Sequence, residues 1–378
     1  MWKTPSALVV IVLILLALGI VMLASTSSVK GQASFHDPLY FLKRQLIWLF
    51  IALLVGFVAS LVDYHHWQRF VIPLGIVSFI LLVLVFAPGI GLKVGGSHRW
   101  LRIGPVSFQP SELAKFTVVL MLASWMSRVQ ARAGNLREGL FLPGMLLGPV
   151  LVLILAEPDF GTTLLTAAVG LAIMYVGGTK PRYLLVCGVV GVCAMALYVM
   201  HDPVRMGRIL AFVEPDKYPE AAYQLGQSKD AFMMGGRWGV GLGESLQKHL
   251  YLPEAHTDFI LAIIGEELGL PATGLVVGLF LGLLVCGLVI SFRAPDVFGR
   301  LLGFGITVMV TLQCAINVGV VTGCLPTKGL PLPFISYGGS SLMLSLLVIG
   351  VLVNIARHST GEMVDEHTYP IKDRAHRF

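Results

Sequence analysis

The residues best suited to chemistry form a short polar stretch directly before a long apolar run. Asp258 follows His256 and Thr257, and a predominantly apolar run begins at Phe259 and extends to residue 291. A carboxylate at the edge of such a run is costly to bury unless it has partners, so a functional role is the default hypothesis. Partial burial would raise the pKa of Asp258, which would suit it to act as a general base near neutral pH.

Two other segments supply cations that could face this carboxylate. Residues 88–111 contain Lys93, Arg99 and Arg102 among glycines and prolines that exclude a long helix, and such a loop can cradle an anion. Residues 325–341 contain three prolines, three glycines and Lys328. Because non-helical backbone at membrane level is tolerated where it lines a cavity, we expect 325–341 to form the second wall of the site.

Three further acidic or basic side chains are candidates with two interpretations each. Glu112 and Lys115 are three residues apart on one predicted helix, so they either pair structurally or contribute to a polar cavity. Asp159 follows Glu157 in a short turn between apolar runs. It either caps the next helix or, together with Glu157, binds a cation or a substrate.

The sequence leaves metal binding open. The adjacent His65 and His66 are better explained by an aromatic and polar interface belt, because adjacent residues rarely converge on a metal without further ligands. A divalent cation, Mg²⁺ or Mn²⁺, held by Asp258 or Asp159 would help to neutralise a departing anion, but no residue pattern requires it.

The elements that position these residues are predicted to be membrane helices. The 378-residue chain is 56% hydrophobic and 13% charged, with a mean hydropathy of +0.82, which excludes an ordinary soluble domain. About 20 apolar residues cross a bilayer. We therefore predict an all-α, polytopic bundle, a single domain over residues 1–378, with about ten spans: 7–25, 45–61, 70–87, 113–126, 140–156, 162–177, 183–200, 259–291, 301–322 and 340–356.

Ten spans place both termini on one side of the membrane. The compact basic loop 128–137 favours a cytoplasmic side for the termini, with a cytoplasmic tail at 358–378. The first apolar run is long for a signal peptide and is expected to be retained. Residues 88–111, 201–257 and 323–339 then lie outside the cytoplasm, and 201–257 is the one large extracytoplasmic loop.

Several other patterns limit the interpretation. The eighth span exceeds the bilayer thickness, so it must tilt, project outward or kink near Gly265. Glu266 and Glu267 within it need partners, and Gln313 with Asn317 suits a hydrogen-bonded seam between helices.

The glycine-rich run at 235–243 is no dinucleotide fingerprint, because no preceding strand is predicted. The net charge of +6 indicates anionic lipid rather than nucleic acid, and the five cysteines predict no disulfide framework.

Over nearly its whole length the chain resembles the SEDS family of bacterial cell-wall proteins, and its division-associated members most closely. Long and specific motifs carry the resemblance. They are GSHRWLRIGPVSFQPSELAKF (96–116), EPDFGTT (157–163), GVGLGESLQKHLYLPEAHTDFILAIIGEELG (239–269) and NVGVVTGCLPTKGLPLPFISYGGSS (317–341).

The resemblance implies a peptidoglycan glycosyltransferase that polymerises lipid II at the outer face of the bacterial cytoplasmic membrane. It implies work at the division septum with a class B penicillin-binding protein transpeptidase and other division proteins. Asp258 would be its catalytic residue. The resemblance also implies that Glu112, Lys115 and Asp159 are polar cavity residues and that Ser336 belongs to the outer loop of the site. Together with cations whose charge could neutralise a departing pyrophosphate, the expected substrate-binding set comprises Lys93, Arg99, Arg102, Gln109, Glu112, Lys115, Asp159, His256, Lys328 and Ser336.

A lipid II flippase is the alternative from another class, since many spans with intramembrane charges and broken helices also describe transporters. The polar residues cluster at the predicted outer ends rather than at the midplane, and no inverted repeat is visible, which favours the enzyme. A non-catalytic scaffold would leave Asp258 unexplained.

Overall fold

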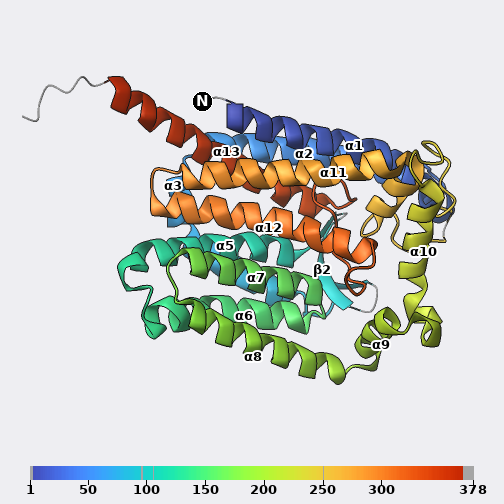
Figure 1. Ribbon diagram of the computed structural model, residues 1–378, viewed down its shortest axis with the longest axis horizontal. Coiled ribbons are helices and arrows are strands. Elements are labelled where there is room, and N and C mark those ends of the chain that lie inside the picture. Colours follow the sequence, from blue (N-terminus) through green and yellow to red (C-terminus); the bar gives the residue numbers. More distant parts are fainter. Residues whose placement is uncertain (1–2, 95–96, 105, 250, 369–378) are drawn as a thin grey trace, which may run out of the picture.

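The computed structural model describes residues 3–94, 97–104, 106–249 and 251–368. The last ten residues of the predicted tail, 369–378, therefore lie outside the described residues. The start of the first helix and the end of the last lie at one end of the bundle (Figure 1). We call the opposite end, which holds the small sheet and two short helices, the loop end.

Each of the ten predicted spans coincides with a helix, which confirms the all-α polytopic fold. Seven described helices are long and apolar enough to cross a membrane, and α4 and α7 are shorter apolar helices. The remaining one, α5, is 20 residues long but includes charged side chains. The ten are α1 (Lys3–Phe35), α2 (Tyr40–Leu61), α4 (Val71–Leu84), α5 (Pro110–Val129), α6 (Leu142–Ala156), α7 (Phe160–Val176), α8 (Pro181–Met200), α11 (Ile260–Phe292), α12 (Val297–Val321) and α13 (Gly339–Thr368).

The core of the bundle forms around α5 and α12. Helix α5 is buried over most of its length because α4, α7 and α12 pack around it. Helix α11 packs on α12 and α1, and α13 packs on α2. By contrast α8 lies at the edge and exposes Leu185 and Val192 by more than 60%, as a surface facing hydrocarbon would (Figure 1).

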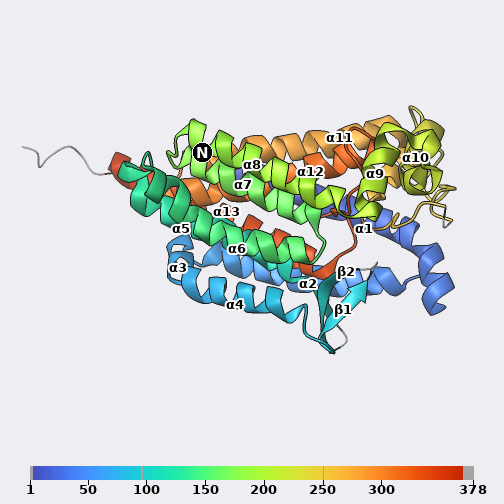
Figure 2. The same cartoon turned by 90° about the horizontal axis from the view of Figure 1, so that it is seen from below.

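The loop end contains more regular structure than the sequence suggested. Residues 88–111 include an antiparallel sheet of β1 (Gly91–Val94), β2 (Ser97–Ile103) and β3 (Val106–Phe108), ordered β1-β2-β3 with Leu92 opposite Trp100 (Figure 2). The 201–257 loop folds into α9 (Pro203–Val213), a 3-10 turn (Pro215–Lys217) and α10 (Pro219–Gly235). The short α3 (Tyr64–Arg69), a 3-10 turn (Gln130–Arg132) and a π-turn (Arg137–Phe141) lie toward the opposite end.

The break in α11 lies at Gly269 rather than near Gly265, which corrects the sequence-based expectation. Gly269 has φ 72° and ψ −166°, a conformation that favours glycine, and Pro271 follows within the helix. A Cβ on Gly269 would lie 2.5 Å from the backbone nitrogen of Gly239, so the close approach of the loop also requires glycine. Residues 260–268 thus form a short half-helix at the loop end.

Candidate functional site

Asp258 lies in the turn that precedes α11, and its backbone is held from two sides. Asn317, on α12, donates from Nδ2 to the carbonyl oxygen of Asp258 (2.8 Å) and to that of Leu330 (2.7 Å). Ser336 donates from Oγ to the carbonyl oxygen of Thr257 (2.5 Å). The segment between α12 and α13 is therefore fastened to the turn that contains Asp258, as expected for the second wall of a site.

The Asp258 carboxylate is half-buried and faces other charged groups. A Cβ added to Gly329 would lie 2.7 Å from Asp258 Oδ2, so the 325–341 segment touches the carboxylate itself. Burial, reinforced by the negative charges of Glu254 and Asp159 and opposed by Arg99, raises the pKa of Asp258 to about 7. Its proton affinity therefore matches a general base that works near neutral pH.

Arg99 and Asp159 form a second part of the site. Asp159 caps α7, accepting from Thr162 N (3.1 Å) and Thr162 Oγ1 (2.9 Å), so the capping interpretation is confirmed. Arg99 extends from β2 and donates to the carbonyl oxygens of Glu157 and Pro158, at 3.3 and 2.6 Å. Its Nη1 lies 4.0 Å from Asp159 Oδ2, which joins the sheet to the start of α7.

Lys328 lies beside this pair over an aromatic platform. Its Nζ is 4.5 Å from the centre of the Phe160 ring, which Arg205 of α9 also approaches at 4.5 Å. Burial and the positive charges of Arg208, Arg205 and Arg99, opposed by Asp159, lower the pKa of Lys328 to about 8. Four cations from three separate segments, Lys328 among them, therefore gather here, and one of them, Arg99, also acts on Asp258.

Arg205 and Arg208 were missed as site residues in the sequence. They lie three residues apart on α9, so the amphipathic pattern within the loop was the signal that could have found them. Arg205 also pairs with Asp202 at 2.9 Å, whereas Arg208 and Lys328 have no salt bridge among the described residues. These two cations are the ones most available to an anionic ligand.

Glu157 was also left out of the predicted set. Its side chain is fully buried, and both carboxylate oxygens lack a hydrogen-bond partner within the described part of the chain. Burial, together with the charge of Asp159 and against that of Arg99, raises the pKa of Glu157 to about 8. The group is therefore largely protonated at neutral pH and subtracts little from the positive charge of the cluster.

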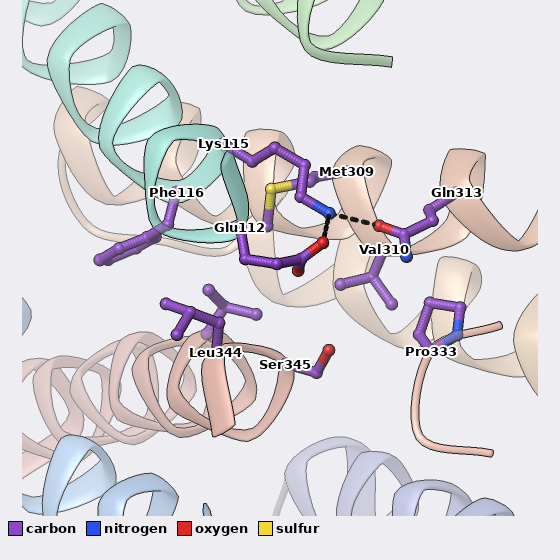
Figure 3. A pocket seen from close by; sticks show the side chains of 10 residues that line it. Glu112, Lys115, Phe116, Met309, Val310, Gln313, Pro333, Leu344 and Ser345 are labelled. Atoms are coloured by element: carbon purple, nitrogen blue, oxygen red, sulfur yellow. Dashed lines mark hydrogen bonds and ion pairs between the residues drawn. The ribbon is translucent and has the colours of Figure 1, made fainter. Parts of the chain in front are cut away.

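Glu112 and Lys115 lie one helix turn deeper, inside the bundle. Lys115 donates from Nζ to Glu112 Oε1 (2.9 Å) and to Gln313 Oε1 (2.7 Å), as Figure 3 shows. Gln313 in turn donates to the carbonyl oxygen of Pro331 (2.8 Å). The adjoining cavity is about 20 Å³, enough for about one water molecule and far too small for a sugar pyrophosphate.

The other predicted substrate residues are distributed around the loop end. His256 packs with Phe41 and Tyr337, and burial lowers its pKa to about 4, so it is neutral at pH 7. Gln109 donates to Ser111 Oγ (3.1 Å), and Arg102 is exposed on β2. The backbone of Lys93 is in β1, but its side chain lies outside the described residues. Their roles toward a substrate stay predictions.

The residues suggested for a divalent cation do not form a ready site. Among the described residues no group of three histidine, cysteine, aspartate or glutamate side chains converges on a common position. Asp159 already uses both oxygens to cap α7. We therefore derive no chemical step through a metal.

The fold and this cluster define an integral membrane protein that gathers one titrating carboxylate and several cations at one end of a helical bundle. The chain belongs to the FtsW/RodA/SpoVE family, whose family model, described as "Cell cycle protein", matches residues 6–361. Probable peptidoglycan glycosyltransferase FtsW of Trichlorobacter lovleyi is 44% identical over 92% of each chain. The Legionella pneumophila protein of the same description is 42% identical, covering 90% of this chain and 88% of its own.

Relatives outside that group are also similar. Stage V sporulation protein E of Bacillus subtilis is 39% identical over 93% of this chain and 96% of its own. A chain of a solved peptidoglycan synthase complex matches with a TM-score of 0.76 at 29% identity, covering 93% of this chain and 97% of that one. The rod shape determining protein RodA of Thermus thermophilus matches with a TM-score of 0.69 at 29% identity, covering 93% and 95%.

Proposed function

We propose that this chain polymerises lipid II into glycan strands with Asp258 as the general base. The chain is a peptidoglycan glycosyltransferase of its family, as its similarity to relatives described as probable peptidoglycan glycosyltransferases supports. The observation that carries the proposal for Asp258 is its setting at the loop end. It is a half-buried carboxylate with a pKa of about 7, Arg99 acts on it, and the segment that touches it contains Lys328, around which further cations gather.

The reaction needs one base and a stabilised leaving group. In lipid II the donor sugar is attached to a pyrophosphate, which is already a good leaving group, so a paired acid is not required as it is for ordinary glycosides. Asp258 takes the proton from the acceptor hydroxyl as that oxygen bonds to the anomeric carbon of the donor. The bond from this carbon to the pyrophosphate breaks, and the lipid pyrophosphate leaves with the electron pair.

The cations stabilise the charge that develops on the pyrophosphate. Within the described part of the chain Lys328 and Arg208 form no salt bridge, and Arg99 and Arg205 lie beside them. Preorganised positive groups in a partly dry site stabilise such charge more than they would in water. Arg208 is exposed, so we propose that it meets the lipid headgroup first.

The cellular setting is part of the proposal. With the termini in the cytoplasm, the loop end lies on the outer face of the membrane, where lipid II polymerisation takes place. The structural match to a peptidoglycan synthase complex supports a partner protein, which we propose is a class B penicillin-binding protein transpeptidase at the division septum. A flippase is not favoured, because the polar cluster lies at one end of the bundle.

Lipid II polymerisation by the purified protein with its partner tests this assignment. Asp258→Asn keeps the shape of the side chain and removes the base, so rates should fall by about 10²- to 10⁴-fold while folding and partner binding persist. Asp216→Asn is the matched control, since Asp216 is exposed in the same loop. It should polymerise as the wild type does.

Lipid II transport into vesicles should be measured in parallel. Long glycan chains from Asp258→Asn would contradict the role of the base. A wild type that moves lipid II across the bilayer but makes no polymer would replace the enzyme with the transporter.

A further inference from the structure

The half-helix that follows Asp258 ends in two adjacent buried glutamates. Glu266 and Glu267 are each 1% exposed, and they lie directly before the break at Gly269. At a rise of 1.5 Å per residue, Glu267 lies about 10 Å along the half-helix from its first residue, Ile260, which follows Asp258 by two positions. Both glutamates lie away from the charged cluster that the proposed reaction uses, so the reaction itself does not explain why they are buried.

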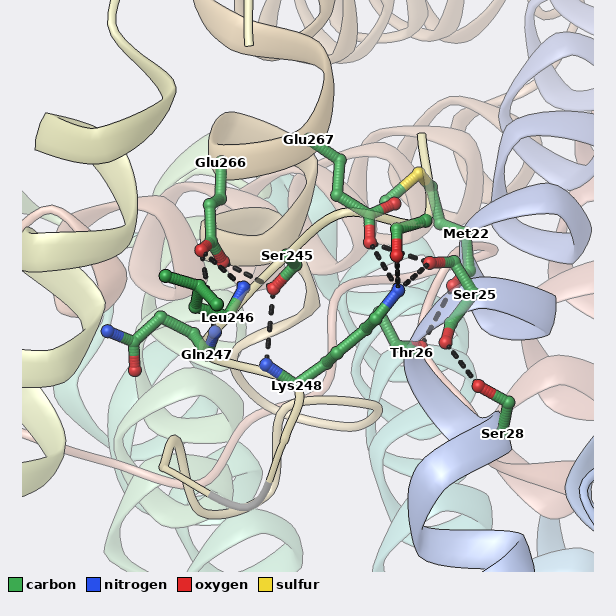
Figure 4. Close-up of polar contacts among 11 residues, drawn as sticks. Met22, Ser25, Thr26, Ser28, Ser245, Leu246, Gln247, Lys248, Glu266 and Glu267 are labelled. Carbon is green, nitrogen blue, oxygen red and sulfur yellow. Dashed lines mark hydrogen bonds and ion pairs between the residues drawn. The ribbon is translucent and has the colours of Figure 1, made fainter. Parts of the chain in front are cut away.

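Glu267 is held by two side chains from separate parts of the chain. Ser25, on α1, donates from Oγ to Glu267 Oε1 (2.6 Å), and Lys248 Nζ lies 3.3 Å from the same oxygen (Figure 4). Lys248 also donates to Ser25 Oγ (3.2 Å), so each of the three side chains Ser25, Lys248 and Glu267 contacts the other two. The Lys248 and Glu267 side chains are 7% and 0% exposed, so the pair is shielded from water and salt.

Glu266 is held by the loop that leads into Lys248. Its carboxylate accepts from the backbone nitrogens of Leu246 (2.9 Å) and Gln247 (3.4 Å) and from Ser245 Oγ. Figure 4 shows Ser245, Leu246 and Gln247 arranged around this carboxylate. Each carboxylate therefore holds a different part of the same loop.

The backbone of this loop also occupies the break in α11. Val240 N donates to the carbonyl oxygen of Glu266 (2.9 Å) and Gly241 N to that of Glu267 (3.0 Å). Pro271 and the turned Gly269 leave these carbonyls without their usual helical donors. We call residues 239–248 the strap, because they replace the missing helix hydrogen bonds and carry Lys248 to Glu267.

We propose that Lys248 and Glu267 are positioning residues that fix the half-helix 260–268, and with it Asp258, in the orientation that the reaction needs. The proposal rests on the proposed function. The half-helix has one end at the Gly269 break and the other at Asp258, so a rotation at the break displaces the carboxylate. The strap and Ser25 oppose that rotation, which couples α1 and the outer loop to the position of the base.

A charged pair suits this task for a physical reason. A buried ion pair adds little net stability compared with apolar residues, because its desolvation offsets its attraction, but it accepts only a narrow geometry. Breaking it leaves an uncompensated charge that draws in water or moves the backbone. The pair therefore specifies where the half-helix lies more than it stabilises the whole fold.

Steady-state polymerisation kinetics of the complex with its partner provide the test, with active enzyme counted by lipid II binding. Lys248→Met should lower kcat by up to about 10²-fold with KM little changed, because small displacements of a reacting group have effects of that size. Lys248→Arg keeps the charge but not the shape of the side chain, so its kcat should lie between those of Lys248→Met and the wild type. A lower folded fraction would change the count of active enzyme but not the kcat of each active molecule.

Two smaller substitutions test the same role with less risk of misfolding than Lys248→Met. Ser25→Ala removes the hydroxyl that bonds both Lys248 and Glu267. Ser28→Ala removes a hydroxyl that, among the described residues, donates to the Ser25 carbonyl oxygen alone (2.9 Å). Ser25→Ala should lower kcat several-fold, shift the acid limb of the pH profile, and speed hydrogen exchange of the amides at 260–268. Ser28→Ala should change none of the three.

The outcomes separate this inference from the proposed function. If Asp258→Asn is inactive but Lys248→Met and Ser25→Ala keep the wild-type kcat and pH profile, the positioning role is wrong and the base assignment stands. If Asp258→Asn polymerises normally, the base assignment fails first. A Lys248→Met protein that loses activity with an unchanged acid limb and unchanged exchange at 260–268 also contradicts positioning.

Discussion

Two clusters of charge, one at the loop end and one a helix turn deeper, differ in how completely their members are paired. In the deeper cluster Lys115 is 4% exposed and holds both Glu112 and Gln313, and its cavity has room for about one water. In the outer cluster Lys328 and Arg208 have no salt bridge among the described residues, and Asp258 is half-buried.

This difference in pairing suggests a structural role for the deeper cluster and a catalytic role for the outer cluster. A cation whose donors are already satisfied by protein has little left to offer a substrate, whereas one held near an aromatic ring and other cations gains from an anion. Gln313 links Lys115 to the segment that contains Lys328, because it accepts from Lys115 and donates to the carbonyl oxygen of Pro331. We therefore expect mutations in the deeper cluster to lower stability and mutations in the outer cluster to lower polymerisation activity.

The largest expected effect is on stability, in the deeper cluster. Lys115→Met leaves Glu112 buried without its cation, and breaking a buried pair costs about 3–5 kcal/mol. Thermal unfolding of the purified protein should show a clear loss. The double variant Glu112→Gln with Lys115→Met should recover most of the lost stability. A Lys115→Met protein as stable as the wild type would contradict a structural role for the deeper cluster.

The next effect is on the geometry of the base. Gly329→Ala places a Cβ 2.7 Å from Asp258 Oδ2, so the carboxylate or the segment must shift. Because small displacements of a reacting group are costly, we expect polymerisation to fall by about 10²-fold with little loss of stability. Gly226→Ala on α10 is the control, since its Cβ meets nothing within 4 Å. Equal activity of the two variants would show that Asp258 has room to move.

A smaller effect is expected from an outer cation. Losing one preorganised donor costs about 10²-fold or more where it acts alone, and because four cations share this site we expect about tenfold for Lys328→Met. Its unfolding temperature should match the wild type, unlike that of Lys115→Met. A Lys328→Met protein that unfolds early but polymerises normally would reverse the assignment of the two clusters.

Much of this arrangement could be predicted from the sequence. Long apolar runs give the ten helices, because the bilayer fixes their length, and the spacing of Glu112 and Lys115 gives their pair. The polar edge before the eighth span identified Asp258 as the base candidate. The need of Glu266 and Glu267 for partners also followed from their position in an apolar span.

The remaining features depend on contacts between distant segments. Lys248 meets Glu267 only because the strap folds back into the break of α11, and Gly269 rather than Gly265 is the break because Gly239 approaches it. The sheet at 91–108 is too short for strand periodicity to identify it. Arg205 and Arg208 join the site through α9, a helix inside a segment that appeared to be a loop.

The pH dependence of kcat/KM for lipid II polymerisation tests the central claim most directly. Asp258 accepts a proton only when ionised, so the rate should rise with pH through about 7. We expect Lys328 to stabilise the leaving group only when it is protonated, so the rate should fall above about pH 8, and Lys328→Arg should move that fall to higher pH. A profile that is flat from pH 6 to pH 8 in the wild type would contradict Asp258 as the general base.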